Sequence, residues 1–190
     1  MSLDVDRLAV DLSGIPANFA AGLKPGAPLP ARLMAARGML PLSPEQNLLV
    51  LYTMALDKTD TKINETVLES VAGLPPEIIG PAIANVNHPG VLDWLIDVRK
   101  DAAAVQLIVI NNNTHSNTIA RIAATADANL CEVIATNQVR VLQAPQIIEQ
   151  MYQNPNARMA TVDRLVELAM RNNVELEGLP GLRDAVSSGQ

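Results

Sequence analysis

Hydrophobic positions recur at helical spacing along most of the chain, from residue 31 to residue 173. The clearest stripe lies in segment 57–77, where apolar residues three or four apart would share one helix face: Ile63, Val67, Val71 and Leu74. The preceding segment, 43–56, begins with Ser43 at a helix N-cap position and Pro44 at the first helical position. A polar turn separates the two segments. The pattern predicts two antiparallel helices joined as a helical hairpin.

Asparagines recur at an interval of 26 residues, at Asn85, Asn111 and Asn137. Each follows a short apolar run, and an isoleucine stands eleven residues after each of them. This regularity predicts stacked repeats, because no helical hairpin of this size buries its apolar face alone. We expect repeats of a short helix, a polar turn and a second short helix over residues 79–104, 105–130 and 131–156, with a fourth, shortened repeat entered from Asn154.

The recurring asparagines have two interpretations. Asparagine adopts left-handed backbone geometry easily, and its side chain bonds nearby backbone groups, so it suits the reversal after a helix. On this interpretation Asn85, Asn111, Asn137 and Asn154 are structural turn residues. The second interpretation is an asparagine-lined ridge that binds a ligand. We favour the turn interpretation.

The two ends of the chain differ from the repeats. Residues 1–30 carry the segment LKPGAPLP, with three prolines within six residues, which favours an extended linker after a weakly ordered lead-in. Residues 174–190 are predicted to form a C-terminal tail. The sequence therefore predicts one helical-repeat domain, residues 31–173, between two irregular ends.

Three segments resemble known helical repeats. The segment LLVLYTMALDKTDTKINETVLESVAGL is similar to a HEAT repeat, and NHPGVLDWLIDVRKDA and NPNARMATVDRLVELA are similar to the leucine-rich repeat variant. The segments LMAARGMLPL and NPNARMATVDRLVELA resemble those of a bacterial, myxobacterial group of HEAT-like proteins. The resemblance implies an all-α, right-handed α-solenoid of short hairpins, and the spacing of the asparagines predicts about 26 residues for each. A cysteine-ligated iron–sulfur cluster known for the leucine-rich repeat variant is not expected, since Cys131 is the only cysteine.

Composition narrows the functional classes. Hydrophobic residues make up 48% of the chain but aromatic residues only 2%, which favours an aliphatic helical core. The net charge of −6 and the lack of a basic cluster argue against binding to nucleic acid. The first residues are acidic where a signal peptide is basic, and the longest apolar run is too short to span a membrane. We therefore expect a cytoplasmic protein that binds neither nucleic acid nor membrane.

Signatures of catalysis and metal binding are missing from the sequence. The ten glycines are scattered rather than grouped in a phosphate-binding loop. His88 and His115 lie in predicted turns, and two histidines without a third ligand make a poor zinc site. Asp57, Asp60 and Glu65 lack the spacing of a calcium loop. We therefore expect no catalytic residue, no metal site and no cofactor.

The remaining expectation is a non-enzymatic module that binds another protein, as a scaffold or a regulator. The resemblance to HEAT repeats implies that second helices form the binding surface, and this points to Trp94, Arg121, Gln146 and Gln150. Trp94, the only tryptophan, suits either a surface anchor or packing between repeats. Three rival functional classes are a HEAT-like DNA-repair glycosylase, a HEAT-like chromophore lyase and a homo-oligomeric structural protein.

Overall fold

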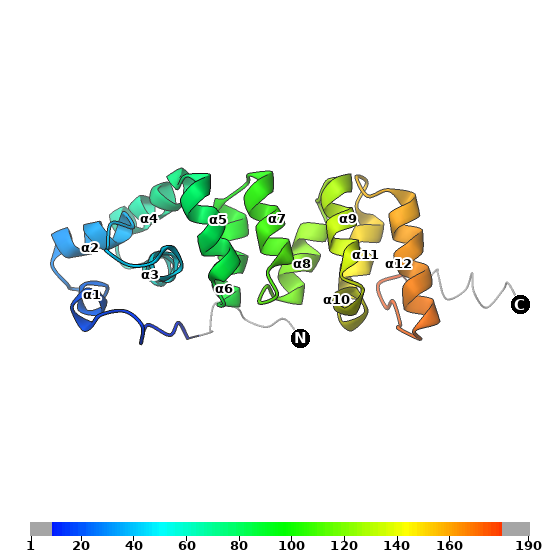
Figure 1. Ribbon diagram of the computed structural model, residues 1–190, viewed down its shortest axis with the longest axis horizontal. Helices are drawn as coiled ribbons and strands as arrows, with labels where there is room; N and C mark the ends of the chain where they lie inside the picture. The colour runs from blue at the N-terminus through cyan, green and yellow to red at the C-terminus, as the bar shows by residue number, and fades with distance from the viewer. Residues whose placement is uncertain (1–8, 180–190) are drawn as a thin grey trace, which may run out of the picture. The chain divides into compact units, whose positions relative to one another are not determined.

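The computed structural model describes residues 9–179, and this part of the chain is helical with no strand (Figure 1). This confirms the prediction of an all-α protein. The helices are α1 Ala17–Gly22, α2 Leu29–Ala36, α3 Pro44–Leu56, α4 Thr61–Gly73, α5 Pro76–Asn85, α6 Pro89–Val98, α7 Ala102–Ile110, α8 Ser116–Ala123, α9 Ala128–Thr136, α10 Gln138–Gln143, α11 Gln146–Gln153 and α12 Met159–Arg171. No helix of the described residues has the length and apolar character to cross a membrane.

The helices form two compact units. The N-terminal unit comprises α1 to α7 and ends at Thr114, and the C-terminal unit begins at His115 and comprises α8 to α12. The division falls inside the predicted repeat 105–130, so that its first helix belongs to one unit and its second helix to the other. The predicted repeat 131–156 holds three helices rather than two, because Asn137 caps an additional short helix, α10.

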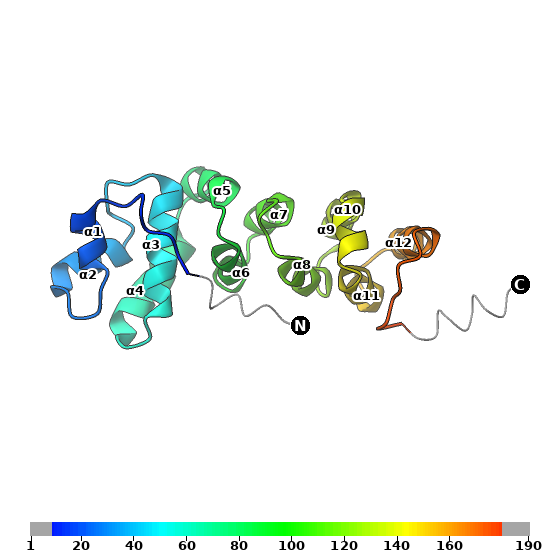
Figure 2. The same ribbon diagram turned by 90° about the horizontal axis from the view of Figure 1, so that it is seen from below.

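In the N-terminal unit, α3 packs against α2, α4, α5 and α6. The predicted hairpin is present as α3 and α4. Ser43 begins α3 with a capping box, in which its hydroxyl accepts from the N–H of Gln46 and the Gln46 side chain accepts from the N–H of Ser43. Asp60 caps α4 by accepting from the N–H of Ile63. In the C-terminal unit, α11 packs against α8 and α12 (Figure 2).

The segment expected to be a lead-in and linker contains structure. Residues 9–30 include α1 and the beginning of α2, and Ile15 and Leu23 are buried. The prolines that suggested a linker have another role, because Pro28 is the N-cap of α2 and Pro30 lies in its first turn, where a missing N–H costs nothing. Residues 1–8 and 180–190 lie outside the described residues.

Buried side-chain donors join helices within each unit. The amide of Asn111, at the end of α7, donates to the carbonyls of Ile83 and Val86 at the end of α5, over 2.7 and 3.0 Å. Asn154, at the end of α11, bonds the carbonyls of Ala123 and Ala126 in the same way. These donors satisfy carbonyls that a helix end leaves without partners, and they hold one helix end against another.

Arg99 also donates to carbonyls at a helix end, through a guanidinium group in place of an amide. It follows α6, is 7% exposed, and one guanidinium nitrogen donates to three carbonyls around the end of α4, those of Val71, Ala72 and Leu74. Its Nε also pairs with Asp101 at 2.8 Å. A guanidinium offers several donors in fixed directions, which suits it to a cluster of carbonyls.

The three regularly spaced asparagines are not equivalent. Asn85 is exposed, and its amide donates to the carbonyl of Pro81 within its own helix. Asn137 is exposed and accepts from the N–H of Arg140 as an N-cap. Of the three, only Asn111 is buried and joins two helices. The interval of 26 residues therefore does not give these residues a common role.

Candidate functional site

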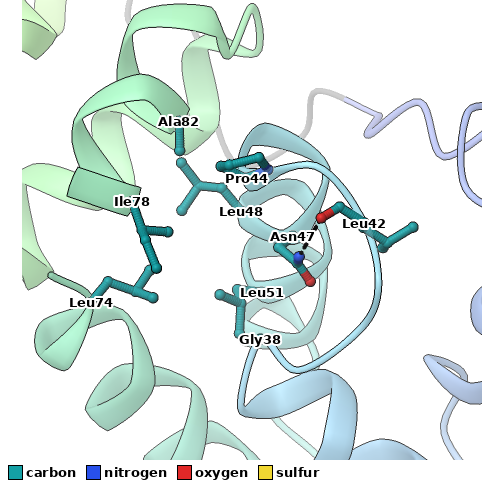
Figure 3. Close-up of a pocket in the computed structure, with 9 residues that line it drawn as sticks. All are labelled: Gly38, Leu42, Pro44, Asn47, Leu48, Leu51, Leu74, Ile78 and Ala82. Carbon is teal, nitrogen blue, oxygen red and sulfur yellow. Dashed lines mark hydrogen bonds between the residues drawn. The ribbon is translucent and has the colours of Figure 1, made fainter. Parts of the chain in front are cut away.

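The N-terminal unit contains an apolar groove of about 240 Å³ (Figure 3). The groove lies between α3 and α5 and is closed at one side by the loop that joins α2 to α3. Its lining consists of small and aliphatic residues with one amide: Gly38, Leu42, Pro44, Asn47, Leu48, Leu51, Leu74, Ile78 and Ala82.

Local sequence features shape this groove. Gly38 ends α2 with a φ of 64°, a left-handed conformation that favours glycine, and this sends the chain toward α3. The Asn47 amide then donates to the carbonyls of Leu40 and Leu42, over 3.1 and 3.2 Å, and holds the loop against α3. On the opposite side, Pro75 and Pro76 begin α5 after the end of α4. The Asn47 side chain thus holds one wall of the groove in place.

The groove has a buried floor and an open rim. Leu48 and Leu51 are each 1% exposed at the floor, whereas Ile78 is 45% exposed at the rim. None of the described lining residues is an acid, a base or a nucleophile. The arrangement can hold an apolar side chain by removing it from water, and it offers no group for proton transfer or covalent chemistry.

A second cluster of interest in the same unit is aromatic. Tyr52, on α3, is 1% exposed, and its ring lies 5.6 Å from that of Trp94 on α6 and 5.5 Å from that of His88. Trp94 itself is half-buried. The tryptophan therefore has one part packed on the core and another part at the surface, so it combines features of a packing residue and of a surface anchor.

Trp94→Ala is expected to lower the free energy of unfolding by about 1.5 kcal/mol, since a half-buried ring contributes less than a core aromatic. Denaturant unfolding of the purified variants measures this loss. Tyr152→Ala is the control, because Tyr152 is 46% exposed and should cost well under 1 kcal/mol. Equal losses in the two variants would contradict the packing of Trp94 on Tyr52.

The other predicted partner residues lie in the C-terminal unit. Gln146 and Gln150 are on α11, and Arg121 is on α8, which packs against α11. Arg121 is exposed. Gln146 is half-buried and donates to the side chain of Asn117 over 3.3 Å, so its amide already has a structural partner.

The titratable residues with possible chemistry are separate from the groove. His115 is the N-cap of α8, where its Nδ1 accepts from the N–H of Asn117. The two imidazole nitrogens of His88 are buried and have no hydrogen-bond partner among the described residues. Cys131 is buried, and burial raises the pKa of its thiol. Within residues 9–179, no three side chains of His, Cys, Asp or Glu are grouped to hold a metal ion.

The groove has no distinct signal in the sequence. Its residues come from two stretches of the sequence, 38–51 and 74–82, and its floor residues Leu48 and Leu51 also belong to the core. The available signal was Ile78, an apolar residue in the first turn of the helix that begins at the Pro75-Pro76 pair. Periodicity alone does not separate such an exposed isoleucine from a buried one.

Comparison of the chain with protein-family models, with curated proteins and with solved structures found no match.

Proposed function

We propose that this protein is a HEAT-like, right-handed α-solenoid in the cytoplasm that binds another protein and has no catalytic activity of its own. Short helices that pack on one another, and buried donors such as Asn111 and Asn154 that join helix ends, support a repeat architecture. The net charge of −6 disfavours nucleic acid as the partner.

The apolar groove is the observation that carries this proposal. An open site with leucine at its floor and an exposed isoleucine at its rim is suited to the apolar side chains of a partner. Two helices that flank a groove are a recurrent means of binding a peptide through apolar anchors. Trp94, Arg121, Gln146 and Gln150 are secondary candidates for partner contact.

Selection from a displayed peptide library on the purified protein tests the proposal. We expect selected peptides to carry apolar anchors and to bind at least tenfold more weakly to Ile78→Glu, because a charge at the rim opposes burial of an apolar side chain. The dissociation constants are measured by fluorescence anisotropy.

Leu68→Glu is the matched control for this experiment. Leu68 is 44% exposed, against 45% for Ile78, but it lies on α4 and does not line the groove. The Leu68→Glu substitution should change peptide affinity less than twofold. Selection of peptides that bind both variants equally, or a failure to select any peptide, would reject the groove as the binding site.

A further inference from the structure

The segment that follows α12 folds back onto the C-terminal unit. Asn173 has a φ of 55°, and the N–H of Val174 donates to the carbonyl of Ala169. This arrangement is a Schellman turn, which ends a helix and reverses the chain. Residues 174–179 then return toward α11 (Figures 1 and 2). There, Gly178 bonds to Glu149, which lies on α11. We call residues 174–179 the strap.

The strap has two apolar anchors and one backbone anchor. Leu176 and Leu179 are both 8% exposed, and Glu177 and Gly178 between them are exposed. The N–H of Gly178 donates to the Glu149 carboxylate over 2.8 Å. A Cβ on Gly178 would lie 2.7 Å from the second oxygen of the same carboxylate, so any larger residue here would displace the Glu149 carboxylate from its present position. The strap therefore has the features of a bound peptide: two side chains inserted and one backbone group recognised.

The strap is held more weakly than the helices of the same unit. None of its residues belongs to a helix, so the helical hydrogen bonds that stabilise the rest of the unit are not available to it. The gain from burying two leucines is of the same order as the conformational free energy of ordering six residues. A segment in this balance can be displaced by a competitor of the same chemistry.

We propose that the strap is an internal ligand, and that it covers a docking surface for a partner protein carrying a Leu-x-Gly-Leu segment. The partner's two leucines would enter where Leu176 and Leu179 lie, and an N–H of its backbone would donate to Glu149. The tethered strap competes with the partner at an effective concentration on the order of millimolar, and so restricts binding to partners that overcome it. This surface uses residues that do not line the groove, and the inference stands independently of the groove.

A labelled peptide of residues 173–179 with blocked ends, added to the full-length chain, tests this inference. In the double variant Leu176→Ser/Leu179→Ser the strap lacks its anchors, and we expect the peptide to bind at least tenfold more tightly than to the unmodified protein. The same peptide with serine at both leucine positions should not bind. A peptide with Gly178→Ala should bind several-fold more weakly, as should the original peptide to a protein that also carries Glu149→Ala.

Met159→Ser is the control in the protein, since Met159 is 70% exposed and its replacement should leave peptide affinity at the unmodified level. Circular dichroism reports whether the double variant keeps its helices. Loss of the helical signal would mean that the two leucines belong to the obligatory core and would overturn the inference. A folded double variant that fails to bind the peptide, or equal binding by the unmodified protein, would overturn it as well.

Discussion

Asn111→Ala is expected to lower the free energy of unfolding by about 3 kcal/mol, because it leaves two buried carbonyls without their donor. The amide of Asn111 donates to the carbonyls of Ile83 and Val86, and the residue is 7% exposed. The side chain also accepts from the N–H of Asn113. Urea unfolding followed by circular dichroism measures the loss.

Asn85→Ala is the matched control for this prediction. Asn85 ends α5 as Asn111 follows α7, but it is exposed and its amide donates within its own helix. Its replacement should change stability by less than about 0.5 kcal/mol. If the two variants lose equal stability, the bond between helix ends does not stabilise the N-terminal unit.

Gly90→Ala is expected to lower the free energy of unfolding by about 2 kcal/mol through overpacking. A Cβ at this position would lie 2.5 Å from the hydroxyl oxygen of Tyr52 and 2.9 Å from Cε1 of His88. Tyr52 is 1% exposed, and its ring centroid lies 5.5 Å from that of His88 and 5.6 Å from that of Trp94, so it has little room to move away. This steric cost exceeds the gain in helix propensity, which is up to about 1 kcal/mol.

A double-mutant cycle with Tyr52→Phe separates the steric cause from other effects of the substitution. Removal of the hydroxyl should recover about 1 kcal/mol of the loss in Gly90→Ala, while the contact with His88 remains. Gly73→Ala is the control, because a Cβ on Gly73 meets no atom within 4 Å. The free energy of unfolding of this variant should stay within about 0.5 kcal/mol of that of the unmodified protein. Additive effects of Gly90→Ala and Tyr52→Phe would contradict the clash.

Local signals predicted the helices well where the sequence carried both a stripe and a cap. Segment 57–77 has the stripe, and Ser43 and Asp60 supply the caps of α3 and α4. Prolines were less informative, because a proline-rich segment suits an extended linker and a helix start equally. At α2 the helix start is favoured over an extended linker because neighbours such as Leu23 are buried, and this burial depends on the folded unit.

The phase of each apolar stripe predicts which asparagines are buried better than the interval of 26 residues does. Ala104, Ile108 and Asn111 are spaced four and three apart, so the asparagine continues the buried face of α7 by one turn. Ile147, Met151 and Asn154 follow the same rule on α11. Asn85 is one residue out of phase with its own stripe, which ends at Val86, and it is exposed for that reason.

The groove was beyond prediction for a different reason. Its walls meet only after α3 and α5 have packed, and the residues of its floor, such as Leu48, look like ordinary core residues of α3. Whether Ile78 is covered depends on what lies opposite it in space. Local sequence does not contain that information.

The amide of Asn111 also restricts how the length of α7 can change. Each residue of an α-helix advances the side-chain direction by about 100°, so one residue inserted within α7 would turn Asn111 away from the carbonyls of Ile83 and Val86. An insertion of three or four residues, close to one full turn, would restore its direction but displace it by about 5 Å along the axis. Insertions and deletions should therefore be excluded from α7.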